Sequence, residues 1–297
     1  MVENIVLVGA GASFGVGEVH PDNPPLGDDL FKNLESQYPN SWGSLPNYIR
    51  SEFLNNFERG MVVLSEFDST LHATLYQAMG AYFAQFSIGK NNHYSTLIDH
   101  LHNSITTGET VFVSLNYDYL LEEAIERAKI DLNSAPETLG GSGTVIKPHG
   151  SCNFFPDSIQ ASGVSFTEGV SFDAGVKQVS KHDIIEYHDS DEALYPVMAL
   201  YRPDKHTQIS PSVINRFREL YREAVSESNT VGIIGAGIHT HDDHIWNPLA
   251  TSEAEIHYIG DRSGFDDWRA KYRDTGRYQY IASKFSDGVD ELISELR

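Results

Sequence analysis

The chain has 297 residues, of which 40% are hydrophobic, so it is long enough to bury a sizeable core as one large domain or as two. Its net charge of −21 disfavours direct binding to a nucleic-acid backbone, although backbone amides can still bind a phosphate. A single cysteine, Cys152, excludes an internal disulfide and a four-cysteine zinc site. No apolar stretch reaches the roughly 18 residues of a membrane span, and no signal peptide is expected before the first strand. We therefore expect a cytoplasmic protein without a membrane partner.

The first predicted strand, Ile5–Val8, ends in the glycine-rich turn Gly9-Ala10-Gly11-Ala12-Ser13. Glycines let the backbone approach a ligand closely, and the amides of such a turn can cradle a phosphate. With Gly15 the spacing is G-x-G-x-x-x-G and not the dinucleotide-binding G-x-G-x-x-G. The turn is therefore a weak signal by itself, and a tight connection without a ligand is the alternative.

A helical pattern follows, from about residue 32 to residue 104. Apolar residues recur at spacings of three and four over Ser44–Glu58 and again over Val62–Phe86, which predicts two helices. We expect the aromatic residues and methionines of these helices to form the core of an insertion after the first strand. They are Leu45, Tyr48, Ile49, Phe53, Leu54, Phe57, Leu64, Phe67, Leu71, Leu75, Met79 and Phe83.

The apolar run that begins at Val111 predicts a strand with both faces buried, and it stops at Asn116-Tyr117-Asp118. A helix-like run, Tyr119–Lys129, follows directly, so these polar residues are expected at the carboxyl end of a strand. Open α/β sheets bind their ligands at that edge. The alternative is that Asn116 and Asp118 only cap the helix behind them.

A short strand, Thr144–Lys147, ends in Pro148-His149-Gly150-Ser151. A histidine in this position can reach into a cleft as a general base, because its unperturbed pKa of about 6.5 lies near neutral pH. It can equally bond only to its own loop. The segment from about 152 to 210 looks irregular and too long for a plain connection, so we expect a lid or an interaction surface. Its cluster of polar residues is expected to be a solvated loop, with a metal site as the alternative; the residues are Asp183, Glu186, His188, Asp189, Asp191 and Glu192.

The C-terminal third alternates helices and strands. The expected elements are a helix from Pro211 to about Ser226, strands Thr230–Ile234, Glu255–Ile259 and Tyr278–Ile281, and a helix Asp287–Leu296. Glycine turns follow two of these strands, at Gly235 and Gly260. The alternation predicts a single α/β domain, residues 1–297, built on a Rossmann-like doubly wound parallel sheet. The helical insertion (about 32–104) and the irregular segment (about 152–210) interrupt it.

The stretch from His239 to His244 offers a different chemistry. Its H-x-H-x-D-H spacing is that of metallo-β-lactamase-type hydrolases, in which a zinc-bound water is the nucleophile. The ligands would be His239, His241, Asp243 and His244. Little chain remains after the motif to supply further ligands and a second β-layer. Asp242 and Asp243 also stand where a helix N-cap is expected.

The sequence motifs at the ends of the predicted strands, taken together, resemble those of sirtuins. Gly9-Ala10-Gly11-Ala12-Ser13 is similar to the sirtuin G-A-G-x-S loop, Asn116-Tyr117-Asp118 to its N-x-D, and His149-Gly150-Ser151 to its H-G-(S/T) element. Gly235-Ala236-Gly237 and Gly260-Asp261 stand where that family has its later turns. The four-cysteine zinc ribbon and the G-I-P-x-F-R segment of sirtuin deacylases are missing. In this respect the chain resembles the zinc-less, sirtuin-like NADases of bacterial anti-phage defence.

This resemblance implies that NAD⁺ is the substrate and is hydrolysed to nicotinamide and ADP-ribose, with no metal expected. Asn116 and His149 would be catalytic, and Asp118 would bind the nicotinamide carboxamide. The pyrophosphate and adenosine contacts would come from Gly9, Ala10, Gly11, Ser13, Gly235 and Asp261. It also implies a role in abortive infection, homo-oligomerisation, and a separate sensor or activator subunit. A deacylase and a non-catalytic NAD⁺ or ADP-ribose sensor are the alternatives.

Overall fold

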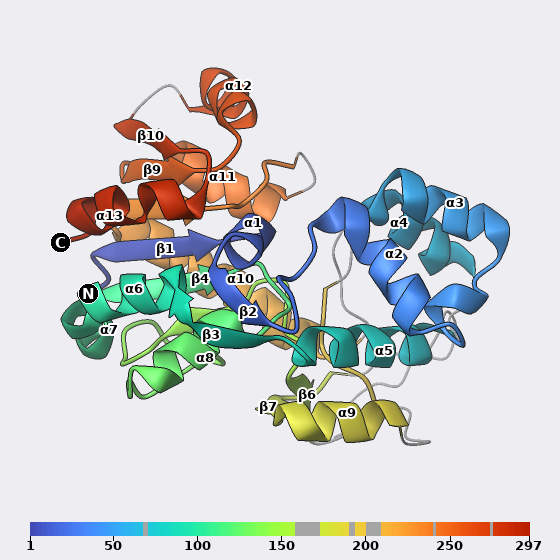
Figure 1. Cartoon of the computed structure of the whole chain (residues 1–297). Helices are drawn as coiled ribbons and strands as arrows, with labels where there is room; N and C mark the ends of the chain where they lie inside the picture. Colours follow the sequence, from blue (N-terminus) through green and yellow to red (C-terminus); the bar gives the residue numbers. More distant parts are fainter. Residues whose placement is uncertain (68–70, 158–172, 190–193, 200–208, 240–241, 274–275) are drawn as a thin grey trace.

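The computed structural model describes residues 1–67, 71–157, 173–189, 194–199, 209–239, 242–273 and 276–297 (Figure 1). Its centre is a six-stranded parallel sheet in the order β10-β9-β8-β1-β4-β5. These strands are β1 (Asn4–Val8), β4 (Thr110–Ser114), β5 (Val145–Ile146), β8 (Thr230–Ile234), β9 (Glu255–Ile259) and β10 (Tyr278–Ala282). The chain winds outward from β1 on one side and from β8 on the other, which confirms the predicted Rossmann-like α/β fold.

Both faces of the sheet are covered by helices, which explains why its strands are apolar at successive positions. In β1, Val6 and Val8 belong to the core that is shared with α6 (His93–His100), α8 (Leu120–Arg127) and α13 (Phe285–Glu295). Ile5 and Leu7 belong to a second core with three helices on the opposite face. Those helices are α10 (Pro211–Glu227), α11 (Asp243–Thr251) and α12 (Arg262–Tyr272).

The predicted strands Thr230–Ile234 and Glu255–Ile259 are confirmed to the residue. The predicted strand Thr144–Lys147 is shorter, because only Val145 and Ile146 pair with β4. Pro148 has no N–H to donate and so cannot extend this pairing. The chain therefore leaves the sheet early, and Lys147 and His149 lie in the loop at its carboxyl edge.

The helical insertion is joined to the sheet through a two-stranded antiparallel ribbon that the sequence did not predict. Its strands are β2 (Gly17–His20) and β3 (Ser87–Asn92). The helices between them are α2 (Gly27–Gln37), the 3₁₀ turn η1 (Trp42–Ser44), α3 (Asn47–Asn55), α4 (Phe57–Phe67) and α5 (His72–Ala84). Figure 1 shows α2, α3 and α4 as a lobe to one side of the sheet. After β3 the chain returns to the sheet through α6 and α7 (His102–Thr107).

The predicted helix boundaries in this lobe are wrong. A helix over 44–58 was expected, but Asn56 is extended and separates α3 from α4. Its side-chain oxygen accepts a hydrogen bond from the amide of Arg59 at 2.9 Å, so it caps α4. Most of the predicted core is buried, with Phe53 stacked on Phe31 at 4.8 Å between ring centroids. The exceptions are Tyr48, Leu54, Phe67 and Leu71, which are exposed.

The segment from 152 to 210 contains regular structure where an irregular loop was expected. Strands β6 (Phe154–Pro156) and β7 (Val176–Gln178) pair antiparallel, and α9 (Lys181–Asp189) packs beside α5. The acidic cluster from Asp183 to Asp189 therefore lies on a helix and not in a solvated loop; Asp191 and Glu192 fall outside the described residues. None of the helices in the described parts of the chain is long and apolar enough to cross a membrane.

Candidate functional site

Four loops follow the carboxyl ends of the neighbouring strands β8, β1, β4 and β5. They begin at Gly235, Gly9, Leu115 and Lys147. Because all four strands are parallel, these loops lie at the same edge of the sheet, and β1 and β8 flank the point where the strand order reverses. The structure therefore brings most of the predicted site residues to one edge.

The two glycine-rich segments pack directly on each other, and the first of them, predicted as a turn, continues as the short helix α1 (Ala10–Phe14). The amides of Gly9 and Gly11 donate to the carbonyl oxygens of Ile234 and Gly235, each at 2.9 Å. A Cβ on Gly9 would lie 2.5 Å from the Cα of Ala236, so backbone contact alone requires glycine there. Gly9 and Gly11 were predicted to bind phosphate through their amides, but both amides donate to carbonyl oxygens of the protein. Ala10, between them, is exposed.

Asn116, in the loop after β4, joins this loop to the first glycine turn. Its Nδ2 donates to the carbonyl oxygen of Gly9 and to the Ser13 hydroxyl, each at 3.0 Å, and the Asn116 side chain is buried. The Ser13 hydroxyl is also 3.2 Å from the hydroxyl of Tyr94 on α6. Sequence reasoning missed Tyr94, because nothing in a helical apolar run marks a residue that bonds across 81 positions.

Asp118 is buried at the start of α8. Its carboxylate accepts a hydrogen bond from the amide of Leu120 at 3.1 Å. Asp118 therefore caps the helix in part, as the alternative to a ligand-binding role predicted. Burial raises the pKa of this carboxyl group, and the nearby Lys147 and the Ser13 hydroxyl partly oppose the rise. The predicted contact with a nicotinamide carboxamide stays a prediction.

A buried ion pair lies under the same edge. Lys147 Nζ donates to Glu122 Oε1 at 2.7 Å and to the backbone oxygen of Asp118 at 2.9 Å, and both charged side chains are almost completely inaccessible. Burial raises the pKa of the Glu122 carboxyl group, and Lys147 partly opposes it. This pair fixes the β5 loop to α8, and thus the loop of His149 to that of Asn116.

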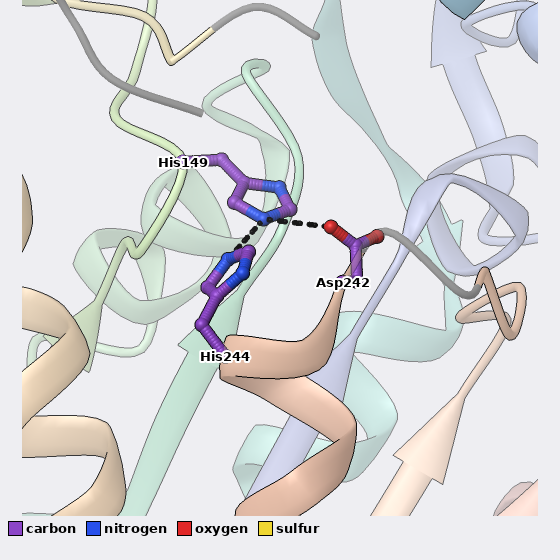
Figure 2. Close-up of side chains that lie close together, drawn as sticks. All are labelled: His149, Asp242 and His244. Atoms are coloured by element: carbon purple, nitrogen blue, oxygen red, sulfur yellow. Dashed lines mark hydrogen bonds and ion pairs between the residues drawn. The ribbon is translucent and has the colours of Figure 1, made fainter. Parts of the chain in front are cut away.

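His149 does not bond only to its own loop. Its Nε2 lies 3.0 Å from Nε2 of His244 and 3.7 Å from Oδ1 of Asp242 (Figure 2). His149 and Asp242 are buried, and His244 is half-buried at the start of α11. The loop behind the histidine is fixed, because Gly150 has φ +77° and a Cβ there would lie 2.0 Å from the carbonyl oxygen of Val197.

The zinc ligands predicted from the H-x-H-x-D-H spacing do not all face one point in the described part of the structure. His244 faces His149, whereas Asp243 and His239 are exposed; His241 lies outside the described residues. Asp242 occupies the N-cap position of α11, but its side chain makes no capping hydrogen bond and is directed at His149. Sequence reasoning considered Asp242 only as a cap, so it missed this contact.

Asp261 caps a helix. Its exposed carboxylate accepts from the amides of Ser263 and Gly264 at 3.2 and 2.9 Å, at the N-terminus of α12. We expect Asp261→Ala to lower the free energy of unfolding by about 1 kcal/mol, measured by urea denaturation. Asp261→Asn should keep most of this stability, so any loss of nucleotide affinity in that variant would report the predicted adenosine contact. Equal stability of the alanine variant and the wild type would contradict the capping role.

A hollow of about 290 Å³ lies at the opposite end of the sheet, where β8 and β9 begin. It is lined by the ends of α10 and α11, including Arg222, Ser252 and Glu253. Doubly wound sheets bind ligands at the carboxyl ends of their strands, so this hollow does not carry the predicted chemistry.

Neither a scan against models of known protein families nor a search of curated proteins returns a match for this chain.

Proposed function

We propose that this chain binds NAD⁺ at the carboxyl edge of the sheet and hydrolyses it to nicotinamide and ADP-ribose. The observation that carries the proposal is the bonding of Asn116 to the glycine turn of Gly9 and Ser13, beside the point where the strand order reverses. The Asn116 side chain is thereby held against the turn at which this fold class binds a nucleotide. His149 follows the adjacent strand.

In the proposed reaction, water adds to the ribose carbon that carries nicotinamide. The carbon–nitrogen bond breaks, and its electron pair stays on the pyridine nitrogen, so nicotinamide leaves as a neutral molecule. The transition state resembles an oxocarbenium ion. An amide such as Asn116 can orient the ribose or the water without adding charge, and orientation alone contributes orders of magnitude to a rate.

The proton that the water loses goes to the pair formed by His149 and His244. At 3.0 Å the two Nε2 atoms share one hydrogen, because one imidazole has to donate and the other accept. The pair can therefore take up one further proton, at the Nδ1 atom of the imidazole that donates the shared hydrogen. Asp242, 3.7 Å from His149, compensates the positive charge that results.

An enzyme that consumes NAD⁺ has to be controlled. From the resemblance to defence NADases, we infer a homo-oligomer whose activity is released by a separate sensor subunit during infection. The net charge of −21 supports placing nucleic-acid recognition on that subunit and not on this chain.

The test is to incubate the purified chain with NAD⁺ in H₂¹⁸O, alone and together with the products of neighbouring genes. We expect nicotinamide and ADP-ribose in equal amounts, with ¹⁸O at the ribose carbon. NAD⁺ bound but not consumed under all conditions would overturn hydrolysis in favour of sensing. Nicotinamide release that requires an acyl-lysine peptide would overturn it in favour of a deacylase.

A further inference from the structure

Three potential metal ligands converge beside the proposed NAD⁺ site. Each of His149, Asp242 and His244 offers one ligand atom, and these atoms all lie within 4.8 Å of one another (Figure 2). They come from two segments far apart in sequence: the loop after β5, and the start of α11. No local motif joins them, because His149 and His244 are 95 positions apart.

The spacing of these atoms fits a tetrahedral metal ion. With metal–ligand distances of 2.0–2.1 Å, two ligand atoms of a tetrahedral zinc ion are about 3.3 Å apart. The His149–His244 separation of 3.0 Å and the His149–Asp242 separation of 3.7 Å lie on either side of that value. Coordination would require adjustments of a few tenths of an ångström at these two contacts. The ligand atoms of Asp242 and His244, which lie within 4.8 Å of each other, would have to approach by up to about 1.5 Å.

We propose that His149, Asp242 and His244 bind one divalent transition-metal ion of the zinc class, which replaces the proton shared by the two imidazoles. Two imidazole nitrogens and one carboxylate oxygen favour zinc, cobalt or iron over magnesium or calcium, which prefer all-oxygen sites. The described residues supply three ligands, and zinc sites with three protein ligands bind water at the fourth position. The carboxylate and the net charge of −21 both favour a cation here.

The test begins with chain that has been stripped by a chelator and is titrated with ZnCl₂ by calorimetry in the absence of NAD⁺. We expect one ion per chain. His244→Gln and Asp242→Asn should each weaken binding on the order of 100-fold or more, because even residues behind the ligands cost 10–100-fold. His239→Gln, an exposed histidine of the same loop, should bind as the wild type does. Absence of binding, or equal weakening by all three substitutions, would overturn the site.

A measurement on the wild type does not depend on how the variants fold. X-ray absorption of the zinc-loaded chain should show two imidazole ligands and oxygen; a shell without imidazole would overturn the proposal. Asn116→Ala should bind zinc normally but release no nicotinamide. A metal-free wild type that is inactive, but binds zinc in this way when zinc is added, would overturn the NADase and leave the metal site standing. A wild type that hydrolyses NAD⁺ but binds no zinc would overturn the metal site and leave the NADase standing.

Discussion

Alanine at either Asn116 or His149 is expected to reduce the rate of nicotinamide release by about 10²–10⁴-fold, the range that general acid–base groups contribute. In the proposed reaction, Asn116 orients the substrate or the water beside the glycine turn, and His149 with His244 accepts the proton. Because both groups act on the reacting bond, the loss should appear in kcat and not only in KM.

The rate is measured with the purified variants by chromatography of nicotinamide, and folding is checked by thermal denaturation. Asn116→Ala removes two buried hydrogen bonds, while the Gly9 carbonyl keeps its bond from the Ala12 amide and the Ser13 hydroxyl its contact with Tyr94. The loss should also cost about 1–3 kcal/mol of stability. His100→Ala, at an exposed position on α6, is the matched histidine control and should keep the wild-type rate. Wild-type turnover in both site variants would contradict the site assignment.

Replacing Lys147 by methionine is expected to lower the free energy of unfolding by about 3–5 kcal/mol, because it leaves the buried Glu122 carboxylate without its ion partner. The same change removes the hydrogen bond from Nζ to the backbone oxygen of Asp118. Stability is measured by urea denaturation at neutral pH. The double variant Lys147→Met with Glu122→Leu should recover most of the loss, because an apolar pair can fill the volume of a buried ion pair without a desolvation penalty. A single variant as stable as the wild type would refute this assignment.

The destabilisation should depend on pH with a defined sign. Burial raises the pKa of Glu122, and Lys147 is the strongest influence that lowers it. Without Lys147 the folded-state pKa rises further above the unfolded value. A raised carboxyl pKa contributes stability that is present below the unfolded pKa and is lost as pH rises through the folded one. The single variant should therefore approach the wild type at acidic pH and fall further below it as the pH increases.

The sheet could be predicted from the sequence because the pattern that marks each strand lies within a few consecutive residues. Strands such as Thr230–Ile234 are short, mainly apolar runs that end in a turn, so their positions follow from their own residues. The helical lobe was less predictable. Its apolar residues are so frequent that several registers fit the periodicity, and the break at Asn56 depends on one capping bond.

The candidate site was predictable only in part. Asn116 and His149 could be placed at strand ends, but their partners Tyr94, Asp242 and His244 come from distant segments. Gly9 and Gly11 were expected to be glycines because they bind a phosphate. Their close packing on Gly235 and Ala236 is a sufficient reason for glycine at both positions.

The ribbon of β2 and β3 has a mechanical consequence. Just before β2 the chain passes through Ser13, and just after β3 it reaches Tyr94, so the two ends of the ribbon lead to the hydroxyl pair beside Asn116. A backbone bond from His93 to Val16, at 2.7 Å, ties the two ends together. The lobe of α2, α3 and α4 is therefore connected, through both strands of the ribbon, to the Ser13 oxygen that accepts from the Asn116 amide. Any displacement of the lobe would reach Asn116 through this connection.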